Sequence, residues 1–233
     1  MRLRRPGPYP GCRSNSKRGE AFIKIIITAG PTREPIDPVR FISNRSTGVM
    51  GYKLAEAASR RRHAVTLISG PVKLSPPKVR KFISIQTADD LLKALRRELK
   101  NADCLIMCAA VGDFRAGRVL KRKIKRGKKL TLELFPNKDL LRELSGLKEG
   151  KLFVGFSLET EALVKNSIKK LKKKNLDLIV ANRLTKNHNP FGYNKLGVVI
   201  IDKTGHRLYI NNKSKAYIAQ VLLDKIDKLW YLK

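Results

Sequence analysis

Short apolar runs alternate with segments of helical periodicity along most of the chain. The first run, residues 22–28 (FIKIIIT), is rich in β-branched side chains, which is typical of a parallel strand buried on both faces. A long loop follows. Apolar side chains then recur at helical spacing from Met50 to Ala58, which predicts a helix that ends near the RRRH sequence at 60–63.

The same alternation continues toward the C-terminus. It predicts strands at 64–70, 81–87, 103–111, 152–157 and 176–182, helices at 88–100, 139–147 and 161–174, and a closing hairpin-like pair at 196–202 and 206–211 before a helix from about Ser214. Within 129–135, Leu130, Leu132 and Leu134 alternate with polar side chains. A period of two predicts a half-exposed strand there, in a hairpin or flap.

This order of elements predicts the fold class. Strands that alternate with helices form an α/β fold, and we expect a doubly wound, mostly parallel, Rossmann-like sheet with a β-hairpin flap. In such sheets, ligands bind beyond the carboxyl ends of the strands. The loops that follow the strands are therefore the candidate site: 28–48, 109–128, 135–139, 156–160 and 181–194.

The composition is that of a globular protein with a high positive charge. The 233 residues are 42% hydrophobic, and the formal net charge is +32. Two clusters, 115–129 with nine basic side chains and 165–174 with six, contain no acid. Such charge favours a nucleic acid partner, but no aromatic side chains interleave with the clusters to stack on bases. We therefore expect no nucleic acid partner, and a basic nucleic-acid-binding protein stays open as the alternative.

The N-terminal segment 1–20 holds six basic side chains and one acid, and it lacks the apolar part of a secretory signal. We expect a basic, disordered tail, with an organellar presequence as the alternative, followed by a single domain at 21–233. No apolar run approaches the roughly 20 residues that span a bilayer, so we expect no membrane partner. Cys12, Cys104 and Cys108 form neither a disulfide framework nor a zinc pattern, which favours the reducing cytoplasm.

The loop after the first strand carries polar chemistry without a standard phosphate-binding motif. It contains neither GxxxxGK[ST] nor GxGxxG, and Gly48 with Gly51 is only a weak sign of a helix N-terminus open to an anion. Hydroxyl, amide and guanidinium donors nevertheless gather there: Thr32, Arg33, Arg40, Ser43, Asn44, Arg45, Ser46 and Thr47. We interpret the loop as ligand-binding. The alternative is architecture, with the prolines shaping the loop and Thr47 capping the helix.

Two further features are open to more than one interpretation. The sequence CAAVGDF at 108–114 ends a strand in small residues that let a planar ring approach, and Asp113 could accept from ribose hydroxyls or form a turn. Lys170 and Lys174 lie four apart on the predicted helix. Their repulsion costs a few tenths of a kcal/mol, which a polyphosphate would reverse. On a chain this basic, however, a solvated lysine face is the default interpretation.

Five motifs occur along the chain in this order: ITAGPTREPIDPVRFISNRSTGVMG, AAVGDF, KIKR, VGFSLET and KKKNLDLIVAN. In their order and spacing they closely resemble the bacterial phosphopantothenoylcysteine synthetase (phosphopantothenate–cysteine ligase) family of coenzyme A biosynthesis, and the match runs from about Ile23 to Asp224. In this family a flavin-dependent decarboxylase is usually fused upstream, and the residues before the match leave no room for it. We therefore expect a stand-alone ligase, with a separate decarboxylase as a possible partner.

The resemblance implies a two-step amide synthesis. The carboxylate of 4′-phosphopantothenate attacks the α-phosphate of CTP, which releases pyrophosphate and leaves an acyl-cytidylate. The amine of cysteine then attacks this mixed anhydride and CMP departs. The resemblance also implies Mg²⁺ and a homodimer whose active sites lie near the subunit interface, with the flap as part of a dimerisation extension.

The resemblance further assigns roles to individual residues. It implies two catalytic residues: Asn44, which positions the acyl-cytidylate for cysteine, and Lys123, the flap lysine that begins KIKR. It implies a nucleotide site formed by Met107, Cys108, Ala109, Asp113, Lys123, Phe135, Pro136, Asn137, Lys138, Phe156, Lys170 and Lys174. Metal ligands are not implied.

Three positions depart from the family's pattern. Val49 stands where the family commonly has the lysine of SGKMG, and the sequence FPNKD at 135–139 stands where it has VKNPD. Where the family has the sequence AND, this chain has Asn182 followed by Arg183. The second departure could alter nucleotide contacts, so the preference for CTP over ATP is inherited from the resemblance. Two rivals are an NAD-dependent reductase, whose glycine fingerprint is missing, and a catalytically degenerate ligase, against which the presence of Asn44, Asp113 and Lys123 argues.

Overall fold

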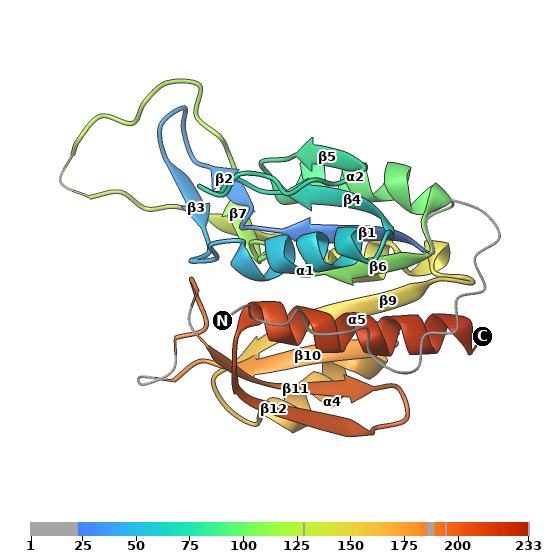
Figure 1. Cartoon of the computed structure of the whole chain (residues 1–233). Coiled ribbons are helices and arrows are strands. Elements are labelled where there is room, and N and C mark those ends of the chain that lie inside the picture. Colours follow the sequence, from blue (N-terminus) through green and yellow to red (C-terminus); the bar gives the residue numbers. More distant parts are fainter. Residues whose placement is uncertain (1–22, 128, 186–188, 194, 233) are drawn as a thin grey trace, which may run out of the picture.

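The computed structural model describes residues 23–127, 129–185, 189–193 and 195–232. Within these ranges a central sheet has the strand order β12-β11-β10-β9-β6-β1-β4-β5 (Figure 1). The strands are β1 (Lys24–Ala29), β4 (Ala64–Ser69), β5 (Lys81–Ser84), β6 (Cys104–Met107), β9 (Leu152–Glu159), β10 (Leu178–Arg183), β11 (Leu196–Asp202) and β12 (Arg207–Lys213). The predicted tail at 1–20 lies outside the described residues.

The strand order reverses direction at β1. This strand pairs in parallel with β4 on one side and with β6 on the other, so that Ile27 lies between Leu67 and Ile106. The parallel part runs from β5 to β10, and β11 and β12 add an antiparallel edge. The predicted doubly wound, mostly parallel sheet is confirmed. Its crevice beyond β1 and β6 is where such sheets bind ligands.

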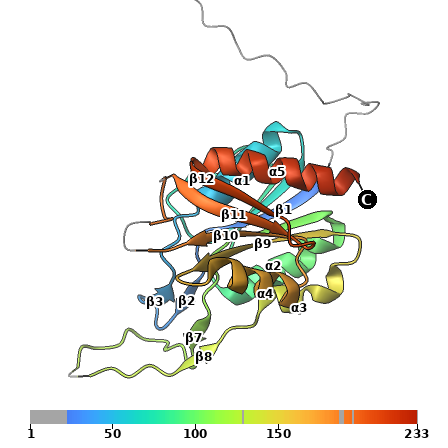
Figure 2. The ribbon, with the colours of Figure 1, turned by 90° about the horizontal axis from the view of Figure 1, so that it is seen from below.

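Helices cover both faces of this sheet, which Figure 2 shows as three layers. One face carries α1 (Val49–Arg60) and α5 (Lys215–Tyr231), and the other carries α2 (Ala88–Glu98), α3 (Leu140–Glu143) and α4 (Leu163–Lys173). Successive side chains of β1 point to alternate faces of the sheet: Ile25 and Ile27 pack toward α1 and α5, and Ile26 packs toward α2. Burial on both faces explains the unbroken apolar run that predicted this strand.

Ion pairs hold the C-terminal end of α1 against α5, away from the carboxyl ends of the parallel strands. The guanidinium of Arg61 contacts carboxylate oxygens of Asp224 at 2.7 Å and of Asp227 at 2.9 Å, and it also donates to Gln220. Arg61 directly follows α1, whereas its partners lie in the middle of α5. The two helices consequently begin at the same edge of the sheet, which is the carboxyl edge of the parallel strands.

Two small hairpins stand away from the sheet. One pairs β2 (Arg33–Pro35) with β3 (Phe41–Ser43), and the other pairs β7 (Phe114–Ala116) with β8 (Leu134–Pro136). We call residues 117–127 and 129–133 the flap; Figure 1 shows it extending beside the β2–β3 hairpin. The prediction of a strand at 129–135 is wrong for most of this range, because β8 begins only at Leu134. Residues 129–133 pair with no strand among the described residues, and Leu130 and Leu132 are exposed.

The remaining helical segments are close to their predicted positions. The helix predicted at 139–147 is a four-residue α3 followed by a 3-10 turn at Ser145–Leu147, and a second 3-10 turn at Leu99–Asn101 ends the α2 region. Thr87 and Asp90 form a capping box at the start of α2, and the hydroxyl of Ser214 caps α5 by accepting from Tyr217 N. Among the described residues, no helix is both long and apolar enough to cross a bilayer.

Candidate active site

The loop after β6, residues 108–113, organises the carboxyl edge of the sheet; we call it the β6 loop. It begins where β6 stops pairing with its neighbours, so its first amides need other acceptors. Thr28, fully buried near the end of β1, provides one. Its Oγ1 accepts hydrogen bonds from the amides of Cys108 and Ala109, each at 3.0 Å.

The rest of the β6 loop is bonded to the loop after β1. The amide of Ala110 donates to the carbonyl of Gly30 at 2.9 Å, and the amide of Thr32 donates back to the carbonyl of Ala110 at 3.1 Å. The amide of Gly112 then donates to Oγ1 of Thr32 at 2.9 Å. These bonds extend the β1–β6 pairing past the ends of both strands and hold the two loops as one unit.

Asn44 is bonded to the middle of the β6 loop. Its Nδ2 donates to the carbonyl of Val111 at 3.0 Å and to that of Ala110 at 3.3 Å, although the residue is otherwise exposed. Ala110 lines a cavity on one side of the β6 loop, and Val111 lines another on the other side. Asn44 lines neither cavity itself, but it holds the loop that separates the two.

The first of these, the α1–α5 cavity, has a volume of about 200 Å³. It opens at the N-terminus of α1, where Gly48 is the N-cap with φ of +78° and no side chain caps the helix. The backbone N–H groups there and the positive end of the helix dipole favour an anion. The cavity is lined by residues 46–51 and 108–110, by Phe156, Ser157, Leu158, Val180, Asn182, Pro190, Phe191, Leu196 and Val198, and by Lys215 and Ile218 of α5.

The predicted alternative for Thr47, a helix cap, is not what the structure shows. Its hydroxyl makes no cap hydrogen bond to α1. Instead, Oγ1 of Thr47 accepts from the amide of Gly192 at 3.1 Å and so holds residues 189–193 at the mouth of the α1–α5 cavity.

The second cavity, the α3–α4 cavity, has a volume of about 180 Å³ and lies on the opposite face of the sheet. It is lined by Met107, Val111, Gly112, Asp113, Asn137, Lys138, Asp139, Leu140, Leu141 and Lys174. Asn137 fixes its floor, because its amide donates to the carbonyl of Asp113 at 2.8 Å and its Nδ2 donates to that of Gly112 at 2.9 Å. The cavity thus joins apolar walls to two lysines and two carboxylates.

Lys170 and Lys174 do not share one binding surface. Lys174 follows the last turn of α4, lines the α3–α4 cavity and contacts Oδ1 of Asp139 at 3.1 Å. Lys170 contacts Oε1 of Glu159 at 2.6 Å and does not line that cavity. Burial acts to raise the pKa of Glu159, but the hydrogen bonds from Lys170, Ser157 and Asn166 and the charge of Lys170 together prevail, and the pKa is lowered. Each lysine has its own carboxylate, so their mutual repulsion is offset locally.

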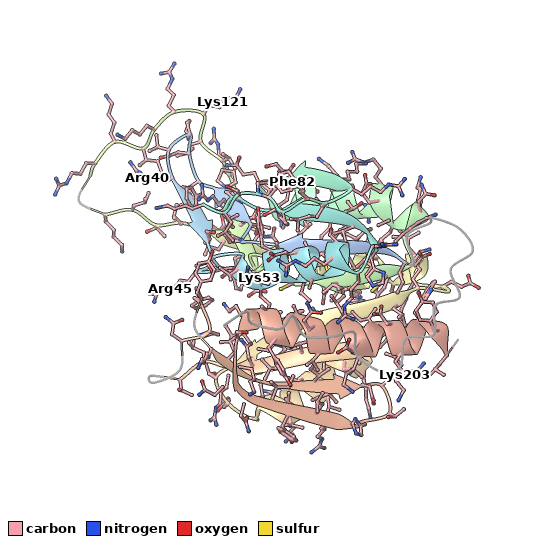
Figure 3. All side chains as sticks on the ribbon, viewed as in Figure 1. Arg40, Arg45, Lys53, Phe82, Lys121 and Lys203 are labelled. Atoms are coloured by element: carbon pink, nitrogen blue, oxygen red, sulfur yellow. The ribbon has the colours of Figure 1, made fainter. Side chains whose placement is uncertain are left out.

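Lys123 lies in the flap, away from both cavities, and is exposed. Figure 3 labels Lys121 of the same flap and Arg40 at the tip of the β2–β3 hairpin, and shows both on the part that stands off the sheet. The flap is anchored beside Lys123. The amide of Ile124 donates to Oδ2 of Asp37 at 3.1 Å, and Nη2 of Arg40 donates to the carbonyl of Ile124 at 2.6 Å.

Asp37 is the centre of this anchor. Its other oxygen accepts from the amides of Val39 and Arg40, each at 2.8 Å. Burial acts to raise the pKa of Asp37, but the hydrogen bonds from Ile124, Val39 and Arg40 prevail, and the pKa is lowered from its ordinary 3.8. Arg40 is thus occupied by the flap, and Arg33 stacks on the Phe41 ring at 4.5 Å. Neither arginine lines either of the two cavities.

The residues predicted to bind nucleotide are divided between several places. Met107, Asp113, Asn137, Lys138 and Lys174 line the α3–α4 cavity, whereas Cys108, Ala109 and Phe156 line the α1–α5 cavity. Phe135 and Pro136 belong to β8 and are exposed. Burial raises the pKa of the Cys108 thiol to about 12, so this side chain lines the wall as a neutral group.

Sequence reasoning missed two groups that the structure brings to the site. Thr28 was predicted only as part of a strand, and nothing in the sequence reveals that its hydroxyl serves the β6 loop. Lys215 did carry a signal, because a cation in the first turn of a helix opposes the helix dipole. It lines the α1–α5 cavity almost fully buried, and burial lowers the pKa of its ammonium.

Comparison with known proteins identifies the family. The family model "DNA/pantothenate metabolism flavoprotein C-terminal domain" matches residues 21–229. The chain belongs to this family. Coenzyme A biosynthesis bifunctional protein CoaBC of Bacillus subtilis (strain 168) is 44% identical over 207 residues, which are 88% of this chain and 51% of that protein. The chain therefore spans about half the length of this curated relative, and the family relationship that the motifs indicated is confirmed.

Solved structures share the fold of this chain. The crystal structure of the C-terminal domain of Coenzyme A biosynthesis bifunctional protein CoaBC has a TM-score of 0.79 at 34% identity, covering 92% of this chain and 98% of that chain. A Cab2 mutant in complex with phosphopantothenate-cysteine has a TM-score of 0.70 at 22% identity, covering 90% and 88%, and at that identity it shows a common fold.

The Asp37 anchor gives a first prediction. Asp37→Ala should accelerate hydrogen exchange of the Ile124 amide about tenfold, because the amide loses a charged acceptor. In the unaltered protein this protection should hold at neutral pH, persist below the ordinary pKa of 3.8 and disappear as the pH falls through the lowered pKa of Asp37. Residue-resolved exchange measured by NMR checks both effects.

A matched control is Asp202→Ala, since Asp202 also accepts backbone amides but does so within the turn after β11. This variant should leave exchange at Ile124 unchanged. Equal exchange at Ile124 in the Asp37 variant and the unaltered protein would show that the carboxylate does not anchor the flap.

Proposed function

We propose that this chain is the phosphopantothenate–cysteine ligase of coenzyme A biosynthesis. It joins 4′-phosphopantothenate to cysteine through an acyl-cytidylate and converts CTP to CMP and pyrophosphate. The family relationship and the name of the 44% identical relative support the pathway. One geometric observation supports the reaction type: two cavities on opposite faces of the sheet meet at a single loop.

In this proposal each cavity holds one substrate. 4′-Phosphopantothenate lies in the α1–α5 cavity, whose mostly apolar walls suit its aliphatic chain and whose helix N-terminus suits its phosphate. The nucleotide lies in the α3–α4 cavity, where Lys138 and Lys174 balance negative charge and Met107 offers an apolar surface to the base. The carboxylate of the first substrate and the α-phosphate of the second then approach each other across the β6 loop.

The first half-reaction makes a mixed anhydride. A carboxylate oxygen bonds to the α-phosphorus, and the bond from that phosphorus to the bridging oxygen breaks, so pyrophosphate leaves with its electron pair. Because two anions must meet, catalysis rests on alignment and on positive charge around the phosphates. Lys138 and Lys174 supply that charge from the cavity, and we propose that Lys123 adds to it when the flap covers the nucleotide.

Mg²⁺ fits this site as a companion of the nucleotide. Magnesium in nucleotide sites takes one or two carboxylates and fills its remaining positions with phosphate oxygens and water, and Asp113 and Asp139 line the cavity. When bound, it would neutralise charge on the triphosphate. Within the described ranges, no group of three His, Cys, Asp or Glu side chains could hold a metal by itself.

The second half-reaction makes the amide. The neutral amine of cysteine attacks the acyl carbon, the amine loses a proton, and the bond from that carbon to the phosphate oxygen breaks to release CMP. Asn44 is the proposed positioning residue, because it holds Ala110 and Val111 at the boundary where the acyl group must lie. Its amide carbonyl oxygen keeps acceptor capacity for the incoming amine.

Use of CTP and not ATP is proposed from the bacterial family. The base would lie against residues 135–138, where this chain has FPNK. Asn137 uses its amide nitrogen and Nδ2 to hold the β6 loop, so its Oδ1 is left to accept from a base or from Arg115, which lies 3.4 Å away. The FPNK sequence therefore keeps the asparagine in a structural role while changing its neighbours.

We also propose a homodimer. The flap and β7–β8 expose apolar side chains that a second copy could cover: Phe114, Val119, Leu130, Leu132, Leu134 and Phe135. Light scattering should give about twice the 26.3 kDa chain mass, and a monomer mass would oppose the proposal. We propose a separate flavin-dependent decarboxylase as partner from the resemblance. We propose a cytoplasmic location from the cysteine pattern, and the free Cys108 thiol suits a reducing compartment.

The test of the proposed function measures pyrophosphate release from purified protein with 4′-phosphopantothenate and Mg²⁺. We expect release with CTP, stimulation by cysteine, and phosphopantothenoylcysteine identified by its mass. ATP and omission of 4′-phosphopantothenate are the controls. Release with ATP alone would support the ligase reaction and refute the proposed use of CTP. No release with either nucleotide would refute the proposed ligase activity.

Asn44→Asp should separate the two half-reactions. A carboxylate cannot donate to the carbonyls of Ala110 and Val111, so the boundary between the cavities loses its positioning contact. We expect pyrophosphate release in one turnover without cysteine, but transfer to cysteine slowed on the order of 100-fold.

Single-turnover analysis of the acyl-cytidylate by mass spectrometry measures both steps. Asn211→Asp is the control, since it makes the same chemical change at an exposed position of β12. Unchanged turnover of cysteine by the Asn44 variant would contradict the assigned role.

A further inference from the structure

Lys215 is a buried cation at the start of a helix. It is the first residue of α5, it is 6% exposed, and it lines the α1–α5 cavity. Both its burial and its place at the positive end of the α5 dipole disfavour the charged form. A buried ammonium is normally balanced by a carboxylate, but no ion pair of Lys215 occurs among residues 23–127, 129–185, 189–193 and 195–232.

The contacts of Lys215 are to backbone oxygens. Its Nζ donates to the carbonyl of Pro190 at 2.8 Å and to the carbonyl of Gly192. The amide of Gly192 in turn donates to Thr47, so α5 and the loop before α1 hold the same short segment. These bonds fix one wall of the cavity, and they bring dipoles, but no negative charge, to the ammonium.

The charge balance of the cavity is one-sided. Its described lining contains no aspartate and no glutamate, and the Cys108 thiol beside it is neutral because its pKa is about 12. The positive groups of the lining are therefore the Lys215 ammonium and the N-terminus of α1, and no acidic side chain in the described lining balances them. An anion in the cavity would be attracted by both, and it would replace the carboxylate that Lys215 lacks.

We propose that Lys215 determines specificity for the phosphate of 4′-phosphopantothenate by serving as its counter-charge in the α1–α5 cavity. This inference rests on the proposed function, because it assumes that this substrate occupies this cavity. In chemical terms the site recognises a phosphate monoester dianion at the end of an aliphatic chain. The same chain without its phosphate, pantothenate, lacks the group that Lys215 would contact.

The experiment compares these two ligands by calorimetric titration. The unaltered protein should bind 4′-phosphopantothenate more tightly than pantothenate. Lys215→Met, which keeps the length of the side chain and removes the charge, should weaken 4′-phosphopantothenate on the order of 10- to 100-fold, as expected for one charged hydrogen bond. The same variant should change the affinities for pantothenate and for CTP by less than about threefold.

Two further variants make the test specific. Lys228→Met removes the same charge from an exposed position of α5 and should leave all three affinities unchanged. Lys215→Gln keeps a donor for the Pro190 and Gly192 carbonyls without the charge. It should lose the preference for the phosphorylated ligand just as Lys215→Met does, and it serves as the test variant if the methionine variant does not fold.

Each other outcome refutes the proposal. Equal weakening of both pantothenate ligands would show that Lys215 only fixes the 190–192 wall, and loss of CTP affinity would assign the charge to the nucleotide. If both Lys215 variants kept the preference for the phosphorylated ligand, Lys215 would not be the counter-charge for its phosphate. Failure of the proposed function is distinguishable, since the unaltered protein would then bind the phosphorylated ligand through Lys215 but release no pyrophosphate.

Discussion

The amides that follow β6 set the constraint on which the site depends. β6 ends at Met107, yet the chain runs on beside β1, and buried amides without acceptors would cost about 1–3 kcal/mol each. Two threonine hydroxyls, from Thr28 and Thr32, and the carbonyl of Gly30 accept from four of the next five amides. The β6 loop is therefore held by the sequence around β1 and cannot be altered independently of it.

This loop divides the carboxyl edge into two compartments. Because the strand order reverses at β1, helices on opposite faces diverge there, and a cavity opens on each side of residues 108–113. The two compartments differ in electrostatics. One contains Lys215 with no acidic side chain among its described lining, whereas the other sets Lys138 and Lys174 against Asp113 and Asp139. In the proposed reaction, this difference keeps two anionic substrates apart until they meet at the loop that Asn44 holds.

The sequence predicted the regular elements because both faces of the sheet are buried, which leaves long apolar runs and clear helical periods. It did not reveal contacts between distant loops: Asp37 with the flap, Thr28 with the β6 loop, or Thr47 with Gly192. The alternating leucines at 130–134 predicted a strand that mostly does not form, since alternation reports a face to be covered but not a pairing partner. The resemblance supplied site residues, whose division between two cavities only the fold reveals.

The environment of Cys108 has a consequence for redox chemistry. A thiol whose pKa burial raises to about 12 is protonated at neutral pH, and only the thiolate attacks disulfides. A thiolate at this position would be open to mixed disulfides with small oxidised thiols. The burial that lets the Cys108 side chain pack in the cavity wall also keeps its sulfur chemically inert toward them.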